Sequence, residues 1–298
     1  MRVIVINSTN LVLDGENNKF VYKFPNSVLF KNNSIAVSSI RMYYSWFNIT
    51  AAYGNNTFSY TWTNAGVTTV YTVVIPDGLY EVDQLNALLQ FNMITQGQYL
   101  IDANGDFVYY AEILVNSSRY AIQINTFLVP TALPATYTSP VGFAGFPTIA
   151  QNPVITLPSY INQVFGYVSG FTTNANVGNA YVPPVSNYVS KLSNGTLSYI
   201  STLAPNVQPN SSVLLSISNV NNPYAQPSSI IYALSPSGAP GSLITDKPPN
   251  YCWNKLVDGS YNELRMTFLG TNLQPLRLND SQVTILLSIK DADEVGAK

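Results

Sequence analysis

The chain has 298 residues, and charged residues make up only 9% of it, against about a quarter in an average globular protein. Its 13 basic and 15 acidic residues give a net charge of -2, and the basic residues lie scattered singly, which argues against a surface for nucleic acid or for an anionic membrane. A surface rich in Asn, Ser, Thr and Tyr suits a protein that packs against neighbours, since a lone solvated enzyme usually carries more charge.

The first 50 residues predict three strands. Residues 2–7 form a short apolar strand that could pair at a sheet edge or with a neighbouring subunit. Residues 19–24 alternate cleanly until Pro25, which is expected to end the strand. Within residues 35–47 the apolar side chains change parity, and a bulge near Ser38 and Ser39 would reconcile the two halves.

The next segment predicts a hairpin followed by the main helix. Residues 57–62 alternate between aromatic and hydroxyl side chains, and a tight connection at 64–66 leads into a second strand at 67–75. After the second strand, apolar side chains recur at helical spacing at Val82, Leu85, Leu89 and Met93. Gly97 is expected to end this helix. We expect this amphipathic helix to plug the open end of a β-fold, and its sequence shows no chemistry.

A second hairpin is predicted from residues 107–115 and 120–125. From residue 128 to about 209 the composition changes, and prolines occur at short intervals with Gly, Ser, Thr and Asn between them. Residues 158–165 read as a brief helix that ends at Gly166. The aromatic content is too high for disorder, so the segment is interpreted as an ordered, loop-rich insertion.

Regular strands return in the last third of the chain. Residues 212–220 and 229–234 alternate, and 235–254, with four prolines, is expected to run extended over the surface. Residues 261–269 and 282–290 are predicted to close the chain as a pair of strands. Short alternating strands with one main helix predict an all-β fold, a single jelly-roll sandwich with a loop-rich β insertion.

The usual catalytic and metal-binding residues are scarce. The chain has no His, the commonest general base and metal ligand, and one Cys, which excludes internal disulfides and Cys-based zinc sites. Cys252 lies between Tyr251 and Trp253 and is expected to serve packing, since no His is present to activate it. No signal peptide or membrane span is evident, which predicts a chain made in a reducing compartment.

Residues 102–106, Asp-Ala-Asn-Gly-Asp, open like a calcium loop. The loop's bidentate acid should stand eleven residues after the first Asp, where the sequence has Ile113, with Glu112 one position short. A hairpin turn at Asn104 and Gly105 is the better interpretation. A catalytic carboxylate pair would need two acids brought together by folding, and the sequence singles out none. We therefore expect no enzyme activity, no catalytic residue, no metal site and no cofactor.

Several stretches in their order along the chain resemble one family of viral proteins. These stretches are 75–80 leading into 85–88, 155–157 leading into 161–166, 248–251, 262–266 and 280–289. Together they resemble the single-jelly-roll minor capsid, or penton, proteins of virophages and polinton-like viruses, of the mavirus type. The resemblance spans both ends of the chain, and apart from 155–157 and 161–166 the middle, residues 128–207, matches no part of it.

The resemblance implies a structural role. Such proteins form homopentamers at the five-fold vertices of an icosahedral capsid, next to double-jelly-roll major capsid proteins, and the chain would be made in the host cytoplasm. It also implies a domain organisation of 1–127 as the first part of the jelly roll, 128–207 as a loop-rich upper domain and 208–298 as the closing strands. A host-surface receptor could contact aromatic residues of the insertion, within 141–146 or 171–188, although packing in the insertion's own small core is the simpler role for them.

Two other classes of protein remain open from the sequence. A carbohydrate- or receptor-binding β-sandwich would also carry Tyr, Trp and Asn in its loops, and exposed aromatic rings beside a groove would distinguish it. A glycoside hydrolase would need two carboxylates facing each other across a cleft.

Overall fold

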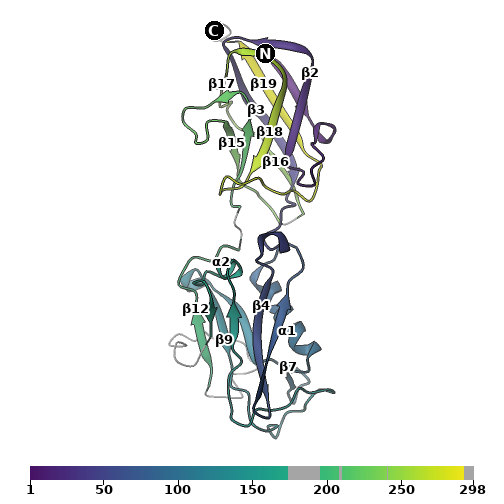
Figure 1. Cartoon of the computed structure of the whole chain (residues 1–298), viewed down its shortest axis with the longest axis vertical. Helices are drawn as coiled ribbons and strands as arrows, with labels where there is room; N and C mark the ends of the chain where they lie inside the picture. The colour runs from purple at the N-terminus through teal and green to yellow at the C-terminus, as the bar shows by residue number, and fades with distance from the viewer. Residues whose placement is uncertain (174–194, 208–209, 240, 292–298) are drawn as a thin grey trace. The chain divides into compact units, whose positions relative to one another are not determined.

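The computed structural model describes residues 1–173, 195–207, 210–239 and 241–291 (Figure 1). The chain divides into two compact units, unit 1 with Met1–Trp46 and Pro209–Lys298, and unit 2 with Phe47–Gln208. The predicted boundary between residues 207 and 208 lies next to this division, whereas the predicted boundary between 127 and 128 lies inside unit 2. The strands between residues 57 and 200 pair among themselves, and alternation along a strand does not reveal its partner.

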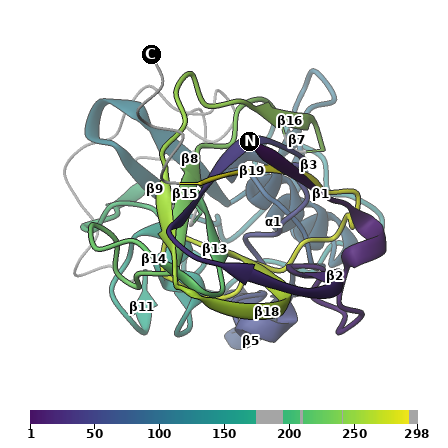
Figure 2. The same ribbon diagram turned by 90° about the horizontal axis from the view of Figure 1, so that it is seen from above.

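Unit 1 is a jelly-roll-like β-sandwich of antiparallel strands. Its six-stranded sheet has the order β1-β19-β3-β17-β14, with β16 also paired to β3, and its four-stranded sheet has the order β15-β13-β18-β2. The strands are β1 (Arg2–Ile6), β2 (Lys19–Phe30), β3 (Asn33–Tyr43), β13 (Val213–Ile217), β14 (Val220–Asn221), β15 (Ile230–Leu234), β16 (Leu243–Asp246), β17 (Asn254–Leu256), β18 (Gly259–Leu269) and β19 (Thr284–Asp291). Consecutive strands mostly alternate between the two sheets, as in a jelly roll. Figure 2 shows β2 and β18 on one side of the unit and β3 and β19 on the other.

The inner faces of the two sheets supply an apolar core for unit 1. Large fully buried side chains come from both sheets, among them Ile6, Phe20, Phe30, Ile35, Ile40, Met42 and Phe268. Side chains of this size each contribute about 1.5–3 kcal/mol when buried. The sandwich is therefore held by apolar packing, and the all-β, jelly-roll-like fold class predicted from the sequence is confirmed.

Two local predictions in unit 1 have different outcomes. The bulge in β3 is confirmed, because Leu286 pairs with Ser39 and Leu287 with Val37, which leaves Ser38 as the extra residue. The prediction that Pro25 ends its strand is wrong, because β2 continues to Phe30. β2 is the last strand in its sheet, and its register with β18 shifts near Pro25, so the missing N–H costs no regular ladder bond.

The predicted pairing of the closing strands is also wrong. β19 pairs with β1 and β3 in one sheet, whereas β18 pairs with β2 and β13 in the other. The extended segment before them contributes β16 and β17, both paired to β3. The N-terminal strand β1 does lie at a sheet edge, as one of the two alternatives predicted.

Unit 2 combines three small antiparallel sheets with two helices in its described part. The sheets have the orders β11-β10-β4-β5, β12-β9-β8 and β6-β7. The elements are β4 (Thr57–Asn64), β5 (Val67–Val74), α1 (Val82–Thr95), β6 (Leu100–Ile101), β7 (Phe107–Val108), β8 (Ala111–Asn116), β9 (Ala121–Thr126), β10 (Ile155–Leu157), α2 (Ile161–Phe165), β11 (Phe171–Thr172) and β12 (Leu197–Ile200). β10 pairs with β4, and β12 pairs with β9. Segments from the predicted insertion thus complete sheets begun before residue 127.

Helix α1 forms as the sequence predicts but lies elsewhere. Its four buried residues are those of the predicted apolar face, Val82, Leu85, Leu89 and Met93. The Gln84 side chain accepts a hydrogen bond from the Glu81 N–H at the first turn, and the chain turns at Gly97 with φ of +65°. The helix packs against β8 and β5 within unit 2. It therefore covers the edge strand of a sheet, whereas the sequence predicted that it would close the open end of a β-fold.

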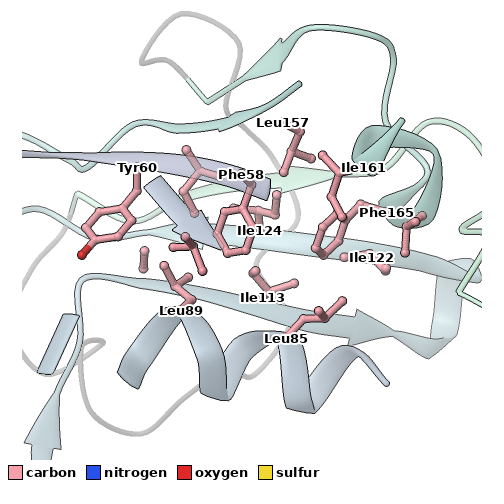
Figure 3. Close-up of a cluster of buried hydrophobic side chains, with 14 of the residues drawn as sticks. Phe58, Tyr60, Leu85, Leu89, Ile113, Ile122, Ile124, Leu157, Ile161 and Phe165 are labelled. Carbon is pink, nitrogen blue, oxygen red and sulfur yellow. The ribbon is translucent and has the colours of Figure 1, made fainter. Parts of the chain in front are cut away.

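Figure 3 shows the core that this packing creates. Leu85 and Leu89 point from α1 toward Ile113 of β8. Phe58 of β4 and Phe165 of α2 close the cluster from the opposite side, with ring centroids 6.3 Å apart. The short helix α2 ends at Gly166 as predicted. Elements from residue 57 to 199 share this core, which is why they form one unit.

Candidate functional site

The predicted turn at residues 102–106 is confirmed as the β6–β7 hairpin. Asp102 Oδ1 accepts hydrogen bonds from the Asn104 N–H at 2.8 Å and the Asp106 N–H at 3.0 Å. Ile113, which stands at the position of the calcium loop's bidentate acid, is fully buried in the apolar core. Among the described residues no three His, Cys, Asp or Glu side chains gather closely enough to hold a metal ion. The carboxylate of Asp102 thus organises a turn.

The prediction for Cys252 is wrong, because its thiol is free and exposed. Its two neighbours pack with each other, with the Tyr251 and Trp253 rings 5.4 Å apart. Lys290 Nζ lies 4.4 Å from the centroid of the Trp253 ring, a cation–π contact. The packing role expected of the cysteine belongs to the tryptophan beside it.

Aromatic residues proposed from the sequence for receptor contact lie largely inside unit 2. Phe143 packs on Phe146 at 4.6 Å and on Trp62 at 6.5 Å between ring centroids, in a second buried cluster. Phe171 packs on Tyr167 at 4.2 Å. Only Val141 of the first segment is fully exposed as a large apolar side chain. Residues 174–188 of the second segment lie outside the described part of the chain. The described aromatic rings therefore serve packing.

A pocket of about 600 Å³ opens between α1, the β6–β7 hairpin and β8. Its lining residues are Asn86 and Gln90 from α1, Gly105, Asp106 and Phe107 from the hairpin, and Tyr109, Ala111, Glu112 and Leu114 before and along β8. Asn86 and Gln90 stand four residues apart, so they share one face of the helix. Both lie outside the predicted apolar face of the helix, and only this spacing could have pointed to a site.

One wall of the pocket is aromatic. Phe107 is 40% exposed and packs on Tyr99 with ring centroids 4.6 Å apart. Tyr109 stands edge-on to Phe107, at 6.5 Å and an interplanar angle of 83°. Both tyrosine rings pack against Phe107, whose own ring remains partly exposed beside the pocket.

The polar wall is built on a chain of buried amides. Asn116 Nδ2 donates to Gln123 Oε1 at 2.9 Å, Gln123 Nε2 donates to Asn125 Oδ1 at 2.8 Å, and Asn125 Nδ2 donates to Glu112 Oε1 at 2.9 Å. All four side chains are at least 95% buried. The amides run head to tail along β8 and β9 and end at the Glu112 carboxylate in the pocket wall. Charge-assisted donation of this kind fixes the carboxylate's orientation.

Asn86 is positioned by the backbone of the neighbouring strand. Its Oδ1 accepts a hydrogen bond from the Ile113 N–H at 2.9 Å. β8 stands at the edge of its sheet, so this bond also satisfies a backbone donor on the free side of the strand. With its carbonyl engaged, the side chain has its NH₂ group left to offer to a ligand.

Two edge strands carry exposed valines. β5 is the last strand of its sheet, runs eight residues without a bulge against β4, and contains no charged residue. Its outward side chains include Val70 and Val74, each 63% exposed. β1 exposes Val3 and Val5 in the same way at the edge of unit 1. An uncharged, regular edge such as β5 is ready to pair with another chain, whereas β1 begins with the charged residue Arg2.

The described fold defines an all-β protein with a jelly-roll-like sandwich. No helix in the described part of the chain is long and apolar enough to cross a membrane. No family model matches the sequence, and no curated protein matches it. Among solved structures, the chain is similar to the mavirus penton protein, with 11% identity, a TM-score of 0.42, and coverage of 97% of this chain and 98% of that one. It is also similar to a chain of the Sputnik virophage structure, with 10% identity, a TM-score of 0.41 and full coverage of both chains. These TM-scores describe a partial likeness, and we rest no function on it.

Proposed function

We propose that the protein is a penton, a minor capsid protein whose homopentamers occupy the five-fold vertices of an icosahedral virus capsid. The observation that carries this proposal is the jelly-roll-like sandwich of unit 1, which the two ends of the chain build together. Stretches at both ends also resemble penton proteins in sequence. The protein would then belong to the virion, contact the double-jelly-roll major capsid protein, and be made in the host cytoplasm.

The surface chemistry of the chain supports assembly. A ring of five subunits needs two different surfaces on each subunit, which meet heterologously. Interfaces that form permanently are depleted in charge and enriched in apolar and aromatic groups. The uncharged strand β5, with Val70 and Val74 exposed, fits one side of such a contact. We propose it as part of the interface between subunits.

The same proposal assigns no reaction to the chain. It has no His, and no group of metal-ligating side chains occurs among its described residues. We further propose that residues 128–207, within unit 2, belong to the part that faces outward from the capsid. Contact with a host-surface receptor would then fall to unit 2.

The mass of the purified protein in solution tests the proposal. Light scattering at several concentrations and ionic strengths is expected to show a species near five times 32.6 kDa. A stable dimer or trimer would contradict a five-fold assembly. A monomer at every concentration would favour the second candidate, a carbohydrate- or receptor-binding β-sandwich, for which the pocket in unit 2 is the specific observation.

A further inference from the structure

The pocket between α1, the β6–β7 hairpin and β8 has the composition of a ligand site. We propose that it binds a neutral saccharide. Its volume of about 600 Å³ falls within the range of small-molecule sites, roughly 300–1,000 Å³. The inference goes beyond the capsid role and does not depend on the oligomeric state, since one subunit supplies every lining residue.

The aromatic wall suits the apolar face of a sugar ring. An aromatic face carries partial negative charge, so it attracts the partially positive C–H bonds that a pyranose presents on one side. Phe107 is open to solvent, and Tyr99 and Tyr109 hold its ring in place. A large apolar ring that is exposed beside a cavity is also a stronger sign of a ligand site than a single apolar ring elsewhere on the surface.

The polar wall selects against charged ligands. Asp106 and Glu112 both line the pocket, and no Lys or Arg stands among its lining residues in the described part of the chain. Two carboxylates disfavour phosphate, sulfate and carboxylate groups. A metal ion or an ammonium group would suit the carboxylates, but neither accepts a hydrogen bond from the Asn86 NH₂ group.

A hydroxyl group satisfies both kinds of partner, because it donates one hydrogen bond and accepts others. Sugar hydroxyls would donate to Asp106 and Glu112 and accept from Asn86. Asn86 is already fixed by the Ile113 N–H, and Glu112 by Asn125. Groups held in place before binding lose little conformational freedom on contact, which favours affinity. These matched donors and acceptors, together with the stacking ring, identify a neutral polyhydroxylated ligand.

An array of immobilised oligosaccharides, containing neutral, sialylated and sulfated members, tests the assignment with the full chain. We expect binding to neutral members. Asp106→Asn and Phe107→Ala should each weaken it at least tenfold, the loss expected for one charge-assisted hydrogen bond or one stacked ring. Asp106 is exposed, so Asp106→Asn is expected to leave the fold intact. The control is Tyr224→Ala, which removes an aromatic side chain that is 97% exposed in unit 1, outside the pocket.

Three results would overturn the proposal: no binding to any neutral member, binding confined to the sialylated or sulfated members, or binding that both pocket variants retain. Light scattering on the same samples separates this test from that of the capsid role. Loss of saccharide binding at unchanged mass would locate the site in the pocket, and an altered mass with binding retained would affect only the proposed assembly.

Discussion

Gly97 provides a sharp test of the packing in unit 2. It has φ of +65°, and a Cβ added there would lie 2.3 Å from Gly142 O and 3.3 Å from Phe143 Cα. The left-handed conformation costs an L side chain about 1–2 kcal/mol. The carbonyl would also have to retreat by about 1 Å to reach ordinary contact, and overpacking of this kind costs about 1–3 kcal/mol. We therefore expect Gly97→Ala to lower the free energy of unfolding of unit 2 by about 2–5 kcal/mol.

The neighbouring backbone makes this retreat difficult. The Ala144 N–H donates to Gly97 O at 2.9 Å, so the two segments are joined at the point where they would have to separate. Phe143, next to the contact, packs on Trp62 in the second buried cluster. A shift of residues 142–144 would therefore disturb apolar packing as well as one hydrogen bond.

Gly142→Ala is the matched control. Gly142 has φ of +76°, and a Cβ there would meet nothing within 4 Å, so the substitution adds conformational strain without the clash. It should cost about 1–2 kcal/mol. Urea unfolding followed by circular dichroism and by tryptophan fluorescence would measure the loss of stability caused by each substitution, with the transitions of the two units analysed separately. Equal destabilisation by the two substitutions would refute the steric argument.

Three further predictions concern the interface, the amide chain and alkaline pH. Val70→Lys should shift the assembled species seen by light scattering toward smaller masses. Val115→Lys, at a valine of similar exposure on β8, should not. Equal effects of the two substitutions would contradict the proposal that β5 is part of the interface. Asn125→Ala should cost about 2–4 kcal/mol in urea unfolding, because it removes the buried acceptor of Gln123 Nε2 and the amide that donates to Glu112. Glu112→Gln, which keeps an acceptor oxygen, should cost less, and the reverse order would contradict the proposed bonding. Burial raises the pKa of Tyr60, Tyr110 and Tyr167 in unit 2, so these groups ionise first in the unfolded chain. The free energy of unfolding should therefore fall above about pH 10, by about 1.4 kcal/mol per pH unit for each tyrosine. A constant free energy of unfolding in that range would contradict this prediction.

Much of the local structure could be predicted from the sequence. Alternation placed Phe58, Tyr60 and Trp62 on the buried face of β4, and the change of parity in β3 located its bulge at Ser38. These features depend on the two-residue period of a strand, which can be read directly from the sequence. The pairing partners of the strands cannot be read from the sequence, because a buried face has the same apolar pattern whichever sheet covers it. For this reason the sequence predicts that the closing strands pair with each other, and it gives no sign that the strands between residues 57 and 200 pair among themselves.

The pocket could not be predicted, because its chemistry depends on segments that only the fold brings together. Asn86 read as the polar side of a helix, and Glu112 as a residue one position away from a metal-ligand pattern. Glu112 and Asn125 face each other because β8 and β9 pair in the register that sets them opposite. A shift of one residue would have turned these side chains to the other face of the sheet.

The scarcity of charge connects these features. Among the described residues, the ion pairs Arg2–Asp291, Lys19–Asp14 and Arg265–Glu263 join side chains that are partly or largely exposed, so they contribute little to stability. Along β8 and β9, unit 2 buries neutral amides that hydrogen-bond to one another, and a single carboxylate ends the series. Burying neutral amides costs less than burying ions, provided that each donor finds an acceptor. Edge strands such as β5 can therefore stay uncharged for the proposed association while the buried amides keep a rigid polar wall at the pocket, and the two proposed functions do not compete for the same residues.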